Sequence, residues 1–356
     1  MAEKIEHGRV ARALAAWFDT AARDLPWRAA GTATGRATRR DPYRVLVSEI
    51  MLQQTQVARV LEKFGSFVER FPTAATLAAA SEDDVLAMWS GLGYYRRARL
   101  LHAAARAVVE RHGGEVPNGV EELLALPGIG RYTAGAIATL AHGEPSAFVD
   151  GNVTRVLLRI AGREGRAGER ATDAWAWEQM GALLEAADRP CETGEAVMEL
   201  GATVCVPKGA RCDRCPVAAH CAARASGRQE EIPLPKIKAK QKRVYAVATV
   251  DRDARGRVLV EQRPRDGMWA GLWQTPTVET DTEPETQPET EAGAAGVVAA
   301  FEYITTHRIF EVRVILGSGG RAIGGRRRVA VSELDGLGIS NLQRRVIDEA
   351  LQSDRS

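Results

Sequence analysis

Four cysteines lie close together near the middle of this chain, in the pattern C-x6-C-x2-C-x5-C. They are Cys205, Cys212, Cys215 and Cys221. A compact loop with four thiolates is typical of a [4Fe–4S] cluster, in which every cysteine is a ligand. Zinc also accepts four thiolates, but zinc ribbons usually carry two C-x2-C pairs far apart in sequence. The spacing therefore favours a [4Fe–4S] cluster, with zinc and then a disulfide as the alternatives. Cys191 stands apart and is expected to be a small buried side chain.

The composition indicates a protein of a reducing compartment. The chain has 356 residues, an odd number of cysteines (five) and a formal net charge of +2. Its first ten residues are charged and lack the apolar segment of a secretory signal, and no run of about eighteen apolar residues predicts a membrane span. We expect a cytoplasmic, nucleoid-associated monomer without membrane contact. Because the net charge is small, affinity for nucleic acid must come from local basic patches.

The chain is long enough for two domains. Residues 1–225 are rich in Ala, Leu and Arg with apolar residues at three- and four-residue spacing, which predicts a mainly α domain. Residues 226–243 hold two prolines and many charges, which is typical of an extended linker.

Residues 244–356 are predicted to form an α+β domain. Runs of β-branched and aromatic residues at 244–250, 258–263 and 301–316 predict strands. Between them, residues 280–292 repeat Thr, Glu and Pro, which predicts a disordered acidic loop.

A tight turn in the first domain has the composition of a phosphate-binding hairpin. Leu126-Pro127-Gly128-Ile129-Gly130-Arg131 lies between two helical stretches, at about 120–141. Gly128 and Gly130 leave backbone N–H groups uncovered, and such groups at a helix start hold a phosphate without regard to base sequence. The turn is also compatible with an ordinary joint between two helices, so by itself it leaves DNA binding and a structural role open.

Two carboxylates are candidates for acid–base chemistry. Asp150 precedes an apolar-periodic helix, where Asp is a favoured N-cap, and Asn152 is placed to orient it. Glu49 lies in an apolar helix, where it is either solvated or buried with a raised pKa that suits a general acid. Two carboxylates in unlike environments are what cleavage of a glycosidic bond requires. Tyr94, in a glycine turn rich in Tyr and Arg, is either a duplex-engaging residue or the start of a basic helix face.

These motifs follow one another in a fixed order along the chain. They are Leu25-Pro26-Trp27-Arg28, Ser48 to Thr55, Gly91 to Tyr95, Leu126 to Arg131, Val149 to Asn152 and the four cysteines. In that order they resemble the MutY family of adenine DNA glycosylases, within the helix-hairpin-helix glycosylase superfamily. The resemblance implies DNA repair by removal of adenine mispaired with 8-oxoguanine or guanine in double-stranded DNA, after the adenine is flipped from the helix into a pocket.

The resemblance also implies a role for each matched residue. Glu49 matches the general acid that protonates N7 of adenine, and Asp150 matches the carboxylate that stabilises or traps the sugar cation. Tyr132 and Asn152 match residues that hold Asp150 and the catalytic geometry. The matches to the adenine pocket are Trp27, Arg28 and Glu195. The matches to the wedge beside the oxidised guanine are Gln54 and Tyr94.

Position 132 distinguishes this family from endonuclease III-like glycosylase-lyases, the main alternative. Those enzymes carry a nucleophilic lysine there, whereas Tyr132 cannot form an imine. Thr154 also stands where some family members have a lysine. We therefore expect base excision without strand cleavage. A non-catalytic iron–sulfur DNA-binding protein is a further alternative, although binding alone needs neither carboxylate.

The second domain resembles the Nudix-like reader of 8-oxoguanine in this family. Gln262-Arg263-Pro264 and Gly271 to Pro276 match its opening strands. The acidic repeat stands where a Nudix catalytic helix would lie, so we expect no nucleotide hydrolysis. The hairpin that inspects the oxidised base corresponds to Thr305-Thr306-His307 and lacks the family's aromatic ring, which leaves the preference for 8-oxoguanine open. The polar segment Gly31 to Arg40 departs from the family pattern and is expected to be a flexible basic loop.

Overall fold

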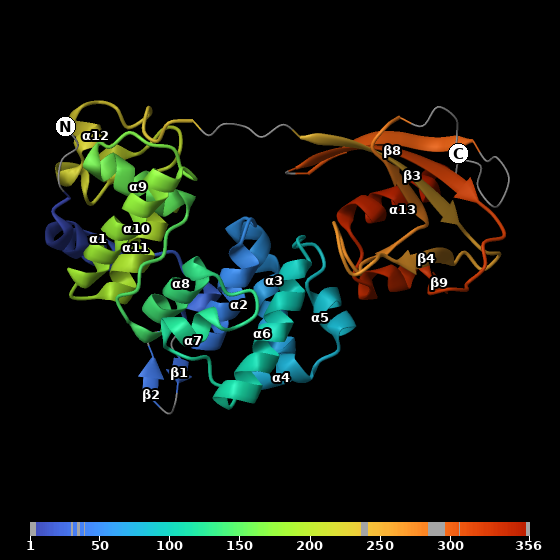
Figure 1. The fold of residues 1–356 in the computed structure, drawn as a ribbon, viewed down its shortest axis with the longest axis horizontal. Coiled ribbons are helices and arrows are strands. Elements are labelled where there is room, and N and C mark those ends of the chain that lie inside the picture. The colour runs from blue at the N-terminus through green and yellow to red at the C-terminus, as the bar shows by residue number, and fades with distance from the viewer. Residues whose placement is uncertain are drawn as a thin grey trace. The chain divides into compact units, whose positions relative to one another are not determined.

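The computed structural model describes residues 5–29, 31–33, 36–38, 40–235, 241–283, 296–305 and 307–353. Two compact units divide the chain. The first combines Met1–Ala79 with Leu100–Ile237, and the second combines Ala80–Arg99 with Lys238–Ser356. Figure 1 shows the first as a set of helices and the second as sheets with a few helices. The predicted mainly α and α+β classes are confirmed.

The first unit is built almost entirely of helices. Its α-helices are α1 (His7–Ala21), α2 (Pro42–Leu52), α3 (Val57–Arg70), α4 (Ala74–Ala79), α7 (Val120–Leu124), α8 (Arg131–His142), α9 (Gly151–Ala161), α10 (Arg170–Glu185), α11 (Pro190–Thr203) and α12 (Ala222–Ala225). Three 3-10 helices are η1 (Pro26–Arg28), η2 (Cys212–Arg214) and η3 (Ala218–His220). Helix α6 (Arg96–His112) begins in the second unit and continues in the first.

Helix α11 organises the core of the first unit. It packs against α1, α8, α9 and α10, and Figure 1 shows α1, α10 and α11 side by side. Residues such as Cys191, Ala196 and Leu200 are buried on it, because these four helices surround it. The predicted burial of Cys191 is confirmed, since its side chain is only 1% exposed. The four-cysteine loop follows directly after this helix.

The helices that carry the two candidate carboxylates begin at well-formed caps. Asp41 caps α2 by accepting hydrogen bonds from the backbone N–H groups of Tyr43 and Arg44, with Pro42 at the first helical position. Asp150 caps α9 in the same way, as the sequence predicted, and its Oδ1 accepts from Val153 N at 2.7 Å. Both caps fix where the helix starts, and therefore the direction of the side chains in its first turns.

The second unit contains two sheets and a helix against one of them. Its elements are α5 (Glu82–Met88), β3 (Lys242–Asp251), β4 (Val258–Gln262), β5 (Trp273–Gln274), β6 (Thr277–Thr280), β7 (Val297–Ile304), β8 (Arg308–Gly317), β9 (Arg326–Val329), η4 (Val331–Gly336) and α13 (Asn341–Ser353). The strand orders are β6-β3-β8-β7 and β5-β4-β9. Strands β3 and β8 are parallel, whereas the other pairs are antiparallel. Helix α13 packs on β3, β7 and β8 and covers the apolar residues that alternate along them.

One expectation about local structure was incomplete and one was wrong. Residues 301–316 contain strand as predicted, but they belong to two strands, β7 and β8, which pair antiparallel on either side of the hairpin expected from the resemblance. Thr305 Oγ1 accepts from Arg308 N at 3.0 Å and thereby closes the turn. Instead of a loop, the segment that begins at Gly31 contains two short antiparallel strands, β1 (Gly31–Ala33) and β2 (Arg36–Thr38). Thr306, and most of the acidic repeat, lie outside the described residues.

Membrane insertion through a helix is not supported. Among the described residues, every helix is too short or too polar to cross a bilayer.

Candidate active site

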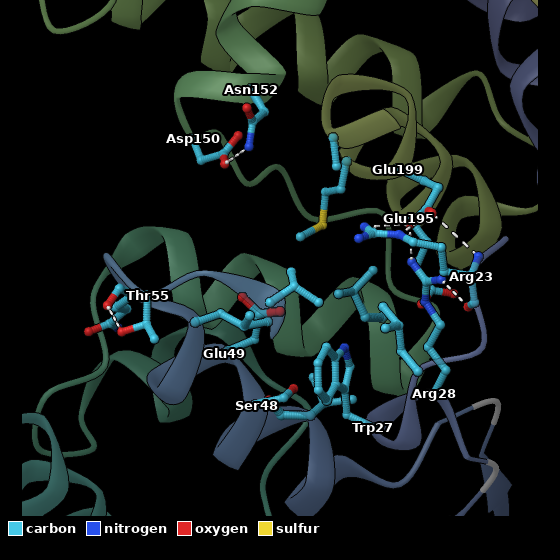
Figure 2. A pocket seen from close by; sticks show the side chains of 18 of the residues that line it. Arg23, Trp27, Arg28, Ser48, Glu49, Thr55, Asp150, Asn152, Glu195 and Glu199 are labelled. Atoms are coloured by element: carbon cyan, nitrogen blue, oxygen red, sulfur yellow. Dashed lines mark hydrogen bonds and ion pairs between the residues drawn. The ribbon is translucent and has the colours of Figure 1, made fainter. Parts of the chain in front are cut away.

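A cavity of about 480 Å³ lies within the first unit. Side chains from η1, α2, α8, α11 and the turn before α9 line it, and Figure 2 shows them around the opening. Eight of the residues predicted from sequence are among its lining: Trp27, Arg28, Glu49, Gln54, Tyr132, Asp150, Asn152 and Glu195. The folding of five separate segments therefore brings together both candidate carboxylates and all three candidate pocket residues.

Glu49 is buried at the floor of this cavity. Its residue is 4% exposed, because α2 packs against α8. Desolvation by burial raises the pKa of its carboxyl from 4.5 to about 7, opposed by a hydrogen bond from Tyr132 and assisted by the charges of Asp150 and Glu195. A carboxyl group with such a pKa is partly protonated at neutral pH and can donate a proton there.

Tyr132 lies beside Glu49 and within the field of Asp150. It is the second residue of α8, so the glycine turn before that helix determines its position. Burial and the charges of Glu49 and Asp150 raise its pKa well above the usual value for tyrosine, so the phenol stays protonated and donates to Glu49. Its ring meets Phe148 edge-on, with centroids 6.0 Å apart. The phenol is thus held by packing on one side and by a hydrogen bond on the other.

Asp150 is fixed by its neighbours along α9. Asn152 Nδ2 donates to Asp150 Oδ2 at 3.1 Å, while the other oxygen caps the helix. Arg155 Nη2 in turn donates to Asn152 Oδ1 at 2.9 Å, and Arg155 Nε donates to the carbonyl of Cys205 at 2.8 Å. A continuous chain of hydrogen bonds therefore runs from the first cysteine of the loop to the candidate catalytic carboxylate.

A network of five charged side chains forms another wall of the cavity. Figure 2 labels four of them, Arg23, Arg28, Glu195 and Glu199. Glu195 and Glu199 lie one turn apart on α11 with side chains 6% and 0% exposed. Arg28 bridges them, with Nε 2.9 Å from Glu195 Oε1 and Nη2 2.9 Å from Glu199 Oε2. Arg23 pairs with Glu199 at 2.6 Å, and Arg40 pairs with Glu195 at 2.6 Å. Two buried carboxylates are thereby matched by three guanidinium groups.

The residues predicted to engage the duplex and the opposite base do not all lie at the cavity. Gln54 is at the cavity with a positive φ of 55°, and Tyr94 is 45% exposed with a φ of 47°. Non-glycine residues rarely adopt this backbone region, which is found mostly at functional sites. Tyr94 and the exposed His307 belong to the second unit. Thr306 is not among the described residues, so its predicted role stays a prediction.

The turn with Gly128 and Gly130 joins α7 to α8. Gly128 has a φ of 76°, and a methyl group on it would lie 2.5 Å from Cβ of Leu100. Gly130 has a φ of −93° and caps α8, and a methyl group on it would meet no atom within 4 Å. The sharp turn therefore depends on glycine at position 128 and not at position 130.

The Gly128→Ala substitution is expected to destabilise the turn, because it combines a strained φ with a clash against Leu100. We expect a loss of about 2 kcal/mol in the free energy of unfolding, together with weaker binding to duplex DNA. Gly130→Ala is the matched control and should leave stability near that of the wild type. Denaturant unfolding and duplex-binding titrations of both variants measure this, and equal effects at the two positions would contradict it.

A second glycine allows a close approach beside Asp150. A methyl group on Gly135, in α8, would lie 1.9 Å from the carbonyl oxygen of Ala147. The segment from Ala147 to Asp150 therefore runs directly against the backbone of α8. This approach places Phe148 under Tyr132 and sets the distance of Asp150 from the same helix.

The four cysteines line one small pocket after α11. Arg159 and Gln229 also line it, and among the described atoms Gln229 Oε1 is buried there without a hydrogen-bond partner. In the described part of the chain, no group of three or more His, Cys, Asp or Glu side chains is arranged to hold a metal ion. The donor set of four cysteine sulfurs around one pocket is the one that a [4Fe–4S] cluster takes, with one cysteine on each iron.

Arg159 holds this loop in place. Its buried guanidinium donates to the carbonyls of Val206 at 2.8 Å and Ile232 at 2.7 Å, and Nη1 lies 3.4 Å from Cys205 Sγ. Burial raises the pKa of the Cys215 thiol to about 12, so a bound cation would have to displace its proton.

Several residues of the site were missed by reasoning from sequence. They are Arg23, Arg40, Arg155, Arg159 and Glu199. Glu195 with Glu199, and Arg155 with Arg159, are like-charged pairs four residues apart in apolar helices. Such a pair on a buried face requires counter-charges or carbonyl partners, and this pattern was the available signal. Arg23 and Arg40 carried no comparable signal.

Comparison with known proteins identifies relatives for both units. A family model described as HhH-GPD superfamily base excision DNA repair protein matches residues 47–180, and a NUDIX domain model matches residues 246–349. The chain is 39% identical over 246 residues to the adenine DNA glycosylase of Mycolicibacterium smegmatis, covering 69% of this chain and 78% of that protein. It is 38% identical over 310 residues to the human adenine DNA glycosylase, covering 74% of this chain and 56% of that protein. The match thus spans little more than half the length of the human relative.

Solved structures of related enzymes share the fold of the first unit. A thermostable thymine-DNA glycosylase superposes with a TM-score of 0.52 at 26% identity, covering 62% of this chain and 98% of that one. A trapped endonuclease III–DNA covalent intermediate gives a TM-score of 0.50 at 21% identity, covering 63% of this chain and 99% of that one. At this identity the likeness shows a shared fold only.

Proposed function

Because this chain belongs to the adenine DNA glycosylases of the HhH-GPD superfamily, we propose that it removes adenine from mispairs in double-stranded DNA. The mispairs are those with 8-oxoguanine or guanine. The observation that carries the proposal is the joint lining of one cavity by Glu49, Tyr132 and Asp150, with the pKa of Glu49 raised to about 7. The reaction is hydrolysis of the N-glycosidic bond of a flipped adenine.

Glu49 acts as the general acid. Its protonated carboxyl donates to N7 of adenine, which turns the base into a neutral leaving group and weakens its bond to the sugar. Tyr132 donates a hydrogen bond to the Glu49 carboxylate and steadies it as the proton leaves. Burial of the Glu49 carboxyl keeps its pKa near neutrality.

Asp150 stabilises the sugar cation that forms as adenine departs, by charge or by a transient covalent bond, before water arrives. Its carboxylate suits this role because Val153 N and Asn152 Nδ2 hold it in one orientation. Base and sugar are thereby met by carboxyl groups from two different elements, α2 and the turn before α9.

Recognition of the substrate is divided among several parts of the chain. Trp27, Arg28 and Glu195 contact the flipped adenine, while Gln54 and Tyr94 enter the duplex beside the opposite base. Tyr94 is suited to this because it is exposed and held near the guanidinium of Arg97, 5.5 Å from the ring centroid. Backbone N–H groups at Gly128 and Gly130 hold a phosphate.

The cysteine loop holds a [4Fe–4S] cluster through Cys205, Cys212, Cys215 and Cys221. With all four cysteines engaged as ligands, the group would contribute structure, holding the loop that Arg155 and Arg159 join to α9. No step of the base excision is assigned to it.

The second unit reads the base opposite the adenine and does not hydrolyse nucleotides. We propose the division into a glycosylase domain (1–225), a linker (226–243) and a Nudix-like domain (244–356). Thr305, Thr306 and His307 at the hairpin between β7 and β8 are the proposed contacts to 8-oxoguanine. The protein acts as a monomer on chromosomal DNA in the cytoplasm.

Single-turnover excision distinguishes this function from a glycosylase-lyase. Duplexes with adenine opposite 8-oxoguanine, guanine or thymine are incubated with the protein and then split into samples with and without alkali. We expect strand breaks only after alkali, and only in the first two duplexes, because Tyr132 cannot form an imine with the sugar. Breaks without alkali would indicate a lyase, and no breaks under either treatment would contradict the glycosylase.

A further inference from the structure

The segment between Ala29 and Asp41 delivers a charged side chain to the active-site cavity. The backbone N–H of Asp41 donates to the carbonyl of Ala29 at 2.9 Å, which closes the base of this segment. Within it, β1 and β2 pair antiparallel. The closed base places Arg40 directly before α2, and Arg40 lines the cavity although it lies outside every motif found in the sequence.

Arg40 shares Glu195 with Arg28. Its Nη2 lies 2.6 Å and its Nε 3.2 Å from Glu195 Oε2, whereas Arg28 Nε lies 2.9 Å from Oε1. The side chains of Arg40 and Glu195 are 21% and 6% exposed, so water screens the pair weakly. Each oxygen of Glu195 is therefore held by a different guanidinium group.

We infer that the hairpin segment supplies Arg40 as a positioning residue, which holds Glu195 in the orientation that recognises adenine. This inference rests on the proposed function and extends it to a residue with no assigned role. Without Arg40, Oε2 of Glu195 would keep, among the described residues, only a long contact of 4.0 Å from Cys191 Sγ, while Arg28 holds Oε1. With Arg40 in place both carboxylate oxygens are held by guanidinium groups, and Glu195 still lines the cavity.

A fixed, ionised carboxylate selects for an exocyclic amino group. Adenine presents N6–H donors to it, whereas hypoxanthine presents an oxygen that the carboxylate repels. A site built around such a hydrogen bond discriminates strongly against the analogue that lacks the donor. Loss of Arg40 should therefore weaken the preference for adenine over hypoxanthine more than it weakens binding to the duplex.

Arg40 also offsets part of the negative charge of Glu195 that acts on Glu49. The charged and titratable groups that act on Glu49 are Tyr132 from α8, Asp150 from the turn before α9, and Glu195 from α11, which is itself paired with Arg28 and Arg40. Removing Arg40 leaves the negative charge of Glu195 less compensated. Ionisation of Glu49 then becomes harder, so the fall in excision with rising pH should move to higher pH.

The test compares Arg40→Gln with wild type in single-turnover excision across a pH series. Duplexes carry adenine or hypoxanthine opposite 8-oxoguanine, with the protein in excess. We expect adenine excision at neutral pH to slow about ten- to a hundredfold through misplacement of Glu195. The ratio of the adenine excision rate to the hypoxanthine excision rate should fall. The pH above which excision declines should move to a higher value. Arg40→Lys keeps the positive charge, so excision should decline at the same pH as in wild type. The excision rate should be restored only in part.

Two further comparisons separate positioning from loss of structure. Arg166→Gln removes an arginine from an exposed ion pair with Glu169 and should behave as wild type. In a Glu195→Gln background, Arg40→Gln should have almost no further effect, since its action passes through Glu195.

The outcomes distinguish this inference from the proposed function. The inference would be overturned, without affecting the proposed function, if Arg40→Gln behaved as wild type in three respects. These are the rate of adenine excision, the pH at which excision falls, and the ratio of adenine to hypoxanthine excision rates. An equal loss for both bases at every pH, in proportion to the folded fraction, would also overturn the inference. Wild-type protein that excises no adenine would overturn the proposed function and this inference with it.

Discussion

Replacing Glu49 by glutamine is expected to slow single-turnover excision of adenine at pH 7 by about a thousandfold or more. Glutamine keeps the size and the hydrogen bond with Tyr132 but has no proton to give to N7 of adenine. Duplex binding should stay near wild type, because Glu49 is buried and not part of the exposed surface. Glu178→Gln, on the exposed face of α10, is the matched control. Excision by Glu49→Gln at more than a tenth of the wild-type rate would contradict the assignment.

The pH dependence of the wild type provides a second check on Glu49. The protonated acid is the active form, so excision should fall as pH rises through about 7, and Glu49→Gln should lack this limb. Because the folded pKa is raised from 4.5, the folded protein binds more protons than the unfolded chain between pH 4.5 and 7. Stability is therefore lost as pH rises through this window, by about 3 kcal/mol for this group. Glu49→Gln should accordingly be more stable than wild type at pH 8, as measured by denaturant unfolding, but not at pH 4.5.

The Asp150→Asn substitution is expected to slow excision by about a thousandfold as well, because the neutral amide cannot stabilise the developing sugar cation. Asparagine is as good an N-cap as aspartate, so α9 should begin at the same residue and the melting temperature should change little. Single-turnover excision and thermal melting, measured in parallel, separate these effects.

Asp173→Asn serves as the control for Asp150. Asp173 also accepts a backbone hydrogen bond, from Gly168 N at 3.0 Å, but lies in α10 away from the cavity. Equal losses of activity in the two variants would indicate a structural role for Asp150. A loss confined to Asp150→Asn, without a change in melting, is the result that the proposed chemistry requires.

The sequence predicts the structure correctly where neighbouring residues alone determine it, as at a helix cap. Asp150 before an apolar-periodic helix predicted the cap that is observed. It was insufficient for Glu49, since Ile50, Met51 and Leu52 make the helix apolar on every side and no periodicity shows which face is covered. Only the packing of α2 on α8 buries this carboxyl and raises its pKa.

Other residues of the site could not be predicted from the sequence, because their contacts join segments that are far apart in the chain. Arg40 reaches Glu195 across 155 positions of sequence, and no spacing rule connects them. Composition alone did not show the turn inside the strand run at 301–316, because Thr305 closes it with its side chain in place of the glycine or asparagine that usually marks a hairpin.

The active site is sensitive to substitution at Gly135, although this residue has no side chain and takes no part in the chemistry. The backbone of α8 and the carbonyl of Ala147 nearly touch there, so any side chain at 135 would push away the segment that ends at Asp150. Among natural variants of this chain, a change at Gly135 would thus resemble a change of the carboxylate itself in its effect on mutation rate. A survey of substitutions that looks only at reactive side chains would overlook it.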